Sequence, residues 1–215
     1  MAITLTTDDL NQEDWSLFSY FDELHDKFPQ MRLLAFFTPL WHHTPTDTEL
    51  VNGITITDDF WKPEFLEFLR ERKDWLSLAA HGLFHDTPDC YGSEDAQKIM
   101  FSKCKSILQQ LHELTGIRVC PYFKPPWYRW KEFTPTMCFE QGYTRFYIPD
   151  GYYELSTIPA PGKNGETINK AIFPLIKREK IGLIDTHVSI TDRMDNRIDR
   201  CYEKIKALLY DQYGE

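Results

Sequence analysis

The chain has 215 residues and a formal net charge of −9, which offers no attraction to nucleic acid or to anionic membrane surfaces. Hydrophobic residues make up 42% of the chain and aromatic residues 15%, which is typical of a globular protein and excludes a disordered one. The length suits one domain with a full-sized core, so we expect a single domain over residues 1–215.

Short apolar or β-branched runs alternate along the chain with segments of helical periodicity. The runs have the composition of strands that are buried on both faces. Six strands are predicted, at Ile3–Thr7, Arg32–Thr38, Trp75–Ala80, Arg118–Phe123, Thr144–Ile148 and Ile181–His187.

Four helices are predicted from apolar residues spaced three or four apart, with stripes that begin at Leu17, Trp61, Ala96 and Ile198. A fifth, short helix is predicted to start at Thr134-Pro135 and to end at Gly142. Ser93 and Gly116 are typical residues for the start and end of the third helix. The stretch Asp150–Gly165 is rich in Pro and Gly and predicts a long loop, and Pro174 argues against an uninterrupted helix over Ala171–Lys180.

The alternation of strands and helices predicts an α/β fold with parallel strands and right-handed crossovers. Six or seven such units can close into a (β/α) barrel, where the chemistry lies at the carboxyl ends of the strands. Polar residues follow one predicted strand after another at this rim. They are Asp8, Asp9, His81, His85, Lys124, Trp127, Asp150 and His187.

The sequence HGLFH, His81 to His85, is the most informative piece of this rim. If the segment turns like a helix, residues four apart share a face and both imidazoles can reach one ion. Imidazole suits zinc, and a catalytic zinc has three protein ligands and one open position. A carboxylate at the end of the first strand would complete the set. A lone HxxxH pair is more often structural or exposed, and it gains weight here from the other rim residues.

The ordered motifs resemble those of the polysaccharide deacetylase family, the NodB-homology domain. The resemblance depends on Asp8-Asp9, HGLFH, the turn Phe123–Pro126 and His187, and it covers Ile3 to His187. It implies a distorted, incomplete (β/α) barrel of seven strands. It also implies a metal-dependent hydrolase of the carbohydrate esterase type, which removes N-acetyl or O-acetyl groups from sugars; some relatives hydrolyse other amides.

The resemblance also implies roles for the metal ligands and the base. By position, Asp9, His81 and His85 match the metal ligands, and one divalent ion, preferably zinc, is expected. Asp8 matches the general base, and Lys124 stands where the family usually has an arginine that steadies that base.

Three further roles follow from the same resemblance. The backbone N–H of Trp127 matches an oxyanion donor, and His187 matches the general acid. Asp150 is a candidate for the carboxylate that orients this acid, with Asp185 as a second candidate close by in sequence.

Three residues depart from the family pattern. Leu10 and Tyr128 stand where glycine is usual, and Lys124 replaces arginine. The departures are compatible with a distinct subfamily, with an altered substrate or with reduced activity.

A second pair of aspartates, Asp58 and Asp59, ends the phrase ITITDD and competes with the pair in ITLTTDD. After Asp9 come a helix and the apolar strand Arg32–Thr38, as the first βαβ unit requires. After Asp59 come only a helix and the strand that leads to His81, which leaves no strand for the second position, so Asp8 and Asp9 are preferred. Asp58 or Asp59 is expected to cap the helix that carries Pro63. The long gap before His81 predicts an insertion around 41–59, where His42 and His43 are either loop histidines or contacts for substrate or an extra ion.

The absence of an apolar run of roughly 20 residues excludes a membrane span, and the start of the chain lacks a signal-peptide pattern. The five cysteines are widely spaced without a CxxC pair, so reduced thiols and a cytoplasmic location are expected. The expected substrate is a saccharide or other small molecule with an acetylated amine. The alternatives are hydrolysis of another C–N bond, as in a cyclic imide or ureide, and a metal-binding module without catalysis.

Overall fold

The computed structural model describes residues 3–41, 56–85, 90, 92–155, 174–188 and 196–214, apart from the side chain of Asp58. Within these residues, eight strands form one sheet in the order β7-β6-β5-β4-β3-β2-β1-β8. The strands are β1 (Thr4–Leu10), β2 (Leu33–Phe37), β3 (Leu76–Ala80), β4 (Arg118–Phe123), β5 (Arg145–Ile148), β6 (Gly151–Glu154), β7 (Leu175–Lys177) and β8 (Leu183–His187).

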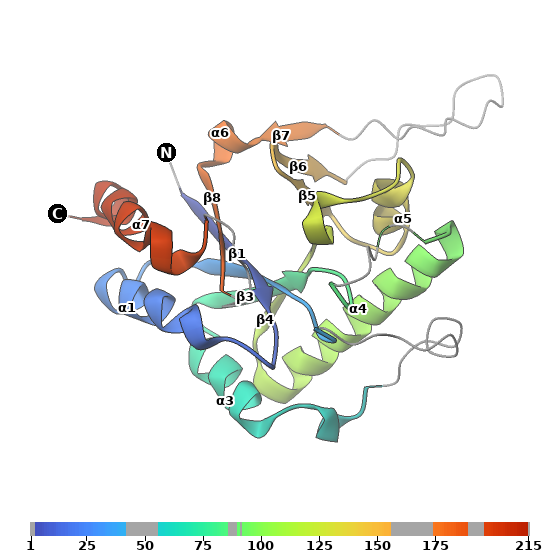
Figure 1. Cartoon of the computed structure of the whole chain (residues 1–215), viewed down its shortest axis with the longest axis horizontal. Helices are drawn as coiled ribbons and strands as arrows, with labels where there is room; N and C mark the ends of the chain where they lie inside the picture. The colour runs from blue at the N-terminus through green and yellow to red at the C-terminus, as the bar shows by residue number, and fades with distance from the viewer. Residues whose placement is uncertain are drawn as a thin grey trace.

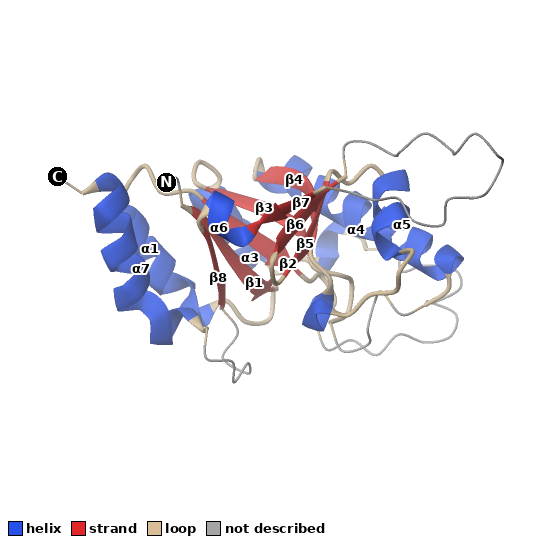
Figure 2. Ribbon diagram, turned by 90° about the horizontal axis from the view of Figure 1, so that it is seen from above, coloured by secondary structure: helices blue, strands red, loops and turns tan. Residues whose placement is uncertain are grey.

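Helices alternate with the parallel strands and cover the outer face of the sheet (Figure 1). Figure 2 shows α1 and α7 at one end of the molecule and α4 and α5 at the other. The α-helices are α1 (Ser19–Lys27), α3 (Pro63–Arg72), α4 (Glu94–Thr115), α5 (Thr134–Glu140), α6 (Arg178–Ile181) and α7 (Ile198–Tyr213). The 3-10 turns are η1 (Ser16–Phe18), η2 (Asp58–Phe60) and η3 (Pro126–Tyr128).

The α/β class and the parallel pairing of the six predicted strands are confirmed, since β8, β1, β2, β3, β4 and β5 are parallel neighbours. The sheet has eight strands where seven were expected. Strands β6 and β7 pair antiparallel to their neighbours, and the described part of the sheet ends at β7 and β8. Within the described residues, the barrel is therefore an open one.

The expectation of a loop from residue 150 is wrong for its first residues, because Gly151–Glu154 forms β6. Gly151 has φ = +140°, which lets the chain reverse directly after β5, and Tyr152 and Tyr153 are good strand residues. Pro174 precedes β7 and needs no ladder donor there. Residues 156–173 lie outside the described part, as does most of the expected insertion at 41–59.

Both faces of the central strands are buried, which explains their continuous apolar composition. Ala35 and Phe37 of β2 point into the main core beneath the helices. Phe36, between them, belongs to a second cluster on the other face, with Tyr147 and Tyr152. The alternation fixes which residues of each strand can reach the interior of the open barrel.

Helix α4 begins and ends at the predicted residues. The Ser93 hydroxyl accepts a hydrogen bond from the Ala96 N–H at 3.3 Å, and Gly116 closes the helix with φ = +74°. The five cysteines form no disulfide, and four of them are buried. In the part of the chain that is described, no helix is long and apolar enough to cross a membrane.

Replacing Gly116 by alanine is expected to lower the free energy of unfolding by about 1 kcal/mol, because a Cβ disfavours the left-handed backbone that ends α4. Denaturant unfolding measures this change. Ser106→Ala, at an exposed site inside the same helix, is the matched control and should not destabilise the protein. An unchanged unfolding free energy for Gly116→Ala would contradict the expected role of the cap.

Candidate metal centre

The two neighbouring carboxylates at the end of β1 reach one cavity because the strand is irregular there. Between the pairs Thr7–Ala35 and Leu10–Phe37, β1 takes three steps while β2 takes two. Asp9 has φ = +66°, as expected for an extra residue in a bulge. In a regular strand, adjacent side chains would point to opposite faces. The bulge lets Asp8 and Asp9 both line the cavity.

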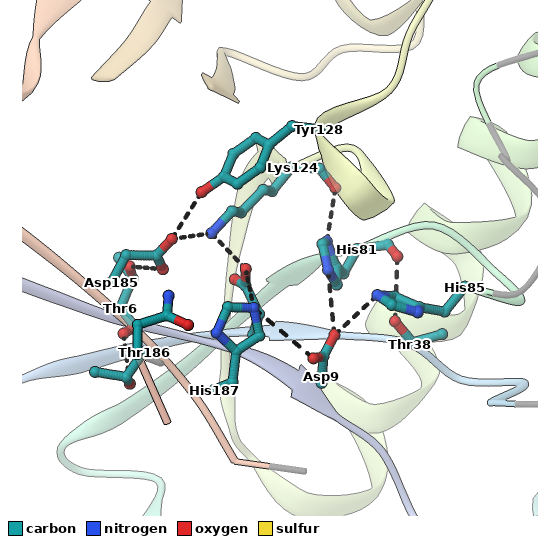
Figure 3. Close-up of polar contacts among 12 residues, drawn as sticks. Thr6, Asp9, Thr38, His81, His85, Lys124, Tyr128, Asp185, Thr186 and His187 are labelled. Carbon is teal, nitrogen blue, oxygen red and sulfur yellow. Dashed lines mark hydrogen bonds and ion pairs between the residues drawn. The ribbon is translucent and has the colours of Figure 1, made fainter. Parts of the chain in front are cut away.

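Three buried side chains converge in that cavity (Figure 3). The Nε2 atoms of His81 and His85 lie 3.4 and 2.9 Å from Oδ1 of Asp9. The candidate ligand atoms of these residues all lie within 4.8 Å of one another. Among the described residues, this is the one group of three or more His, Cys, Asp or Glu with that geometry.

The three residues fit a divalent cation. Oδ1 of Asp9 is buried and receives no well-aligned hydrogen bond from the described residues, although two imidazole nitrogens are close to it. Candidate ligand atoms that lie this close together without well-aligned hydrogen bonds between them are typical of residues that bind one shared ion. Two imidazoles and one carboxylate suit zinc and leave a coordination position open.

The two histidines approach each other through a sharp turn. The helical turn that was considered for HGLFH in the sequence is not formed. Gly82 has φ = +78° and His85 has φ = +64°, and residues 81–85 form no helical turn. Nδ1 of His81 lies 2.9 Å from the carbonyl oxygen of Lys124. This contact orients the ring so that Nε2 faces Asp9, as outer contacts do for metal-binding histidines.

A second group of charges lies beside this trio, centred on Lys124. Its ammonium lies 2.5 Å from Oδ2 of Asp8 and also contacts Oδ2 of Asp185. The Tyr128 hydroxyl donates to Oδ2 of Asp185 at 2.7 Å, and the Thr6 hydroxyl donates to its Oδ1 at 2.7 Å. Lys124 is 2% exposed, so this ammonium depends on its carboxylates for neutralisation.

The charges in the cavity shift one another's ionisation. Burial, followed by the charge of Asp185, raises the pKa of Asp8, and the Lys124 ammonium opposes this rise. Burial would lower the pKa of Lys124, but Asp185 and Asp8 outweigh it and raise that pKa. Burial would raise the pKa of Asp9, but the adjacent imidazoles of His81 and His85 hold it well below its usual value. A lysine that stays charged helps Asp8 to ionise.

His187 ends β8 directly opposite Asp8 in the parallel pair. Its Nε2 lies 3.5 Å from Oδ2 of Asp8 and 3.9 Å from Oδ2 of Asp9, and the side chain lines the cavity. The predicted base and the predicted acid therefore both lie beside Asp9, His81 and His85.

Asp150 is not brought to the cavity. It is exposed in the turn between β5 and β6, where its carbonyl oxygen accepts a hydrogen bond from the Arg178 N–H at 2.7 Å. The immediate reversal into β6 leaves its side chain at the surface. Asp185, from the middle of β8, is the additional carboxylate in the interior, and it contacts Lys124.

Trp127 forms part of the cavity wall and is 50% exposed. Its indole N–H donates to the carbonyl oxygen of His85 at 2.9 Å, and its ring lies 5.1 Å from the His85 ring. Trp41 lies 4.4 Å from the same imidazole, so two tryptophans flank His85.

Backbone strain concentrates around the cavity. Four non-glycine residues in the described part of the chain have positive φ: Asp9, His85, Trp127 and Tyr128. All four line the cavity. Such conformations persist only where the surrounding structure enforces them, and they cluster at functional sites.

The second aspartate pair lies apart from this site. Asp59 is exposed, and its carboxylate accepts a hydrogen bond from the Thr57 hydroxyl. The expected capping of α3 is wrong, because Lys62 occupies the N-cap position and no side chain caps the helix; Pro63 does begin it. His42 and His43 lie outside the described residues.

The sequence does not predict that Tyr128 and Thr6 belong to this site. It offers Asp185 only as the second candidate for the carboxylate that orients the acid, although period-two alternation in LIDTH places Asp185 and His187 on one face of β8. That alternation was the available signal for Asp185. Neither Tyr128 nor Thr6 carries a comparable local signal, because their contacts depend on how β1, β8 and the loop after β4 assemble around Lys124.

Comparison with solved structures identifies the fold. One similar structure is a mutant of a CE4-family pseudoenzyme of Bacillus anthracis with restored enzymatic activity; it has a TM-score of 0.53 and 14% identity over 98% of this chain and 63% of that one. Another is the Xyl-CE4 domain of a multidomain xylanase from the hindgut metagenome of Trinervitermes trinervoides. It has a TM-score of 0.52 and 12% identity over 99% of this chain and 91% of that one.

The chain has the CE4 fold. CE4 comprises the NodB-like polysaccharide deacetylases, so the resemblance inferred from the motifs is confirmed at the level of the fold. No protein-family model matches the sequence, and no curated protein matches it significantly. The chain spans less than two thirds of the length of the pseudoenzyme mutant.

Proposed function

We propose that the chain is a single-domain, metal-dependent hydrolase that removes an acetyl group from an N-acetylated sugar or a related small amide. The observation that carries the proposal is the buried Asp9–His81–His85 trio with Asp8 and His187 beside it. Zinc is the ion that this donor set favours. A bound divalent ion would polarise the acetyl carbonyl and acidify a bound water molecule.

The side chains beside the trio have distinct tasks in this proposal. Oδ2 of Asp8 takes the proton from the attacking water, and Lys124 holds that carboxylate ionised and in place. Nε2 of His187 gives a proton to the departing amine nitrogen, which leaves poorly as an anion. The backbone N–H of Trp127 is proposed to donate to the oxyanion.

The size of the cavity sets where the substrate lies. The cavity beside the trio is narrow and has room for water molecules, so we propose that the acetyl group enters it. The sugar ring is proposed to lie at its mouth, where the half-exposed Trp127 offers an aromatic face.

Two alternatives remain in other classes. Hydrolysis of a cyclic imide or ureide would use the same ion. A non-catalytic metal-binding module is suggested by the pseudoenzyme among the similar structures and by Lys124 and Tyr128, which depart from the family pattern.

The deciding experiment is an acetate-release screen of the zinc-loaded chain over N-acetylated and O-acetylated saccharides, with a chelator-treated sample as control. We expect about one ion per chain and acetate release that depends on it. Turnover of cyclic imides or ureides without acetate release would favour the first alternative. Metal binding without turnover of any of these substrates would favour the second.

A further inference from the structure

A buried lysine at an active centre must be held in place by something, because its stem is flexible and its ammonium has no fixed fork. We propose that Asp185 and Tyr128 are positioning residues that hold the Lys124 ammonium against Asp8, and so fix the carboxylate that accepts the proton. This inference rests on the proposed function and adds two residues to it.

The contacts of Asp185 support this role. Its Oδ2 accepts hydrogen bonds from Lys124 and from Tyr128, and its Oδ1 accepts one from the Thr6 hydroxyl (Figure 3). Asp185 is opposite Thr6 in the β1–β8 pair, two residues before the pair of His187 and Asp8. The sheet register therefore places the anchor one layer below the base.

The surroundings of the ammonium restrict it further. The Lys124 Nζ lies 4.8 Å from the centre of the Tyr128 ring and 5.4 Å from that of Phe36. These aromatic faces attract a cation and exclude water. Asp8 and Asp185 both contact the ammonium, so any movement away from Asp8 would break a buried ion pair.

The backbone of Tyr128 is an independent observation. Trp127 and Tyr128 are successive non-glycine residues with φ of +55° and +51°. Such a turn is strained, and strain is kept only where tertiary contacts over-determine it. The inward hydroxyl of Tyr128, bonded to Asp185 at 2.7 Å, is such a contact.

The test is a double-mutant cycle in the zinc-loaded full chain, with the acetylated saccharide that gives the fastest acetate release. Asp185→Asn is expected to lower kcat roughly 10-fold to 100-fold, with KM and zinc content unchanged. Tyr128→Phe is expected to lower kcat a few-fold alone, about as expected for one lost hydrogen bond to a charge, and to add little in the Asp185→Asn background. Asp26→Asn and Tyr210→Phe, both at exposed helix sites, are the matched controls.

A further arm shows whether Asp185 acts through the lysine. In a Lys124→Met background, Asp185→Asn should change kcat less than about twofold; an equal loss in both backgrounds overturns the inference. If Asp185→Asn does not fold, the cycle of Tyr128→Phe with Lys124→Met decides in the same way.

A crystal structure of the Tyr128→Phe variant gives a readout that needs no activity. Lys124 held on Asp8 with unchanged order would overturn the inference, and a displaced or disordered ammonium would support it. Absence of both acetate release and bound zinc in the unmodified chain would instead overturn the proposed function.

Discussion

Replacing His81 or His85 by alanine is expected to remove the bound zinc and to lower the rate of acetate release by more than about a hundredfold. A hundredfold loss is already the upper range for removing an outer contact of a metal site, and these residues are proposed as direct ligands. With two of three protein ligands left, the ion exchanges with solvent, and the acidified water is lost.

Metal analysis after dialysis measures the first effect, and acetate release measures the second. His112→Ala is the matched control, because His112 is exposed on α4, away from the cavity, and its Nδ1 contacts the Ile117 carbonyl oxygen. That control should keep about one zinc per chain. Full zinc content in the His81→Ala and His85→Ala variants would remove both histidines from the proposed ligand set.

The sequence predicted those parts of the fold that depend on local pattern. Strands with apolar residues on both faces, such as Leu33–Phe37, and a long helix with a serine cap and a terminal glycine are legible from spacing alone. Strand β6 was missed because Gly151 and the residues after Glu154 indicate a turn. The two tyrosines gain their strand partners from β5, across a tight turn, and from β7, which lies about twenty residues later in the chain.

The convergence of Asp9, His81 and His85 was predictable for a different reason. A parallel sheet carries the carboxyl ends of its strands to one rim, so polar residues after successive strands converge there. What could not be predicted is how neighbours in sequence share one side of a strand. Asp8 and Asp9 do so through a bulge, which has no sequence signature beyond the residues themselves.

The choice between Asp150 and Asp185 shows the same limit. Position after a strand favoured Asp150, whereas the structure leaves it in an exposed turn and buries Asp185 within β8. A charged residue inside a strand is costly unless it is paired. Its partner here, Lys124, comes from a loop sixty-one residues earlier in the chain, so only the three-dimensional arrangement reveals the pair.

Asp8→Asn is expected to lower kcat for acetate release by about a hundredfold to ten-thousandfold, the range that general acid–base groups contribute. Asparagine keeps the shape of the side chain but cannot take a proton from water. The variant should retain zinc, because Asp9, His81 and His85 remain. It should also fold, because Lys124 keeps its contact with Asp185.

The two measurements together separate the base from the metal. Kinetics with the zinc-loaded variant give kcat, metal analysis gives occupancy, and Asp26→Asn, exposed on α1, controls for a carboxylate-to-amide change. If Asp8→Asn hydrolyses the substrate at the unmodified rate, Asp8 is not the base. If it loses zinc as His81→Ala is expected to do, Asp8 belongs to the ligand set, and the separation of roles between the adjacent aspartates is wrong. A variant that keeps its ion and loses its rate is the result expected for a base beside a metal centre.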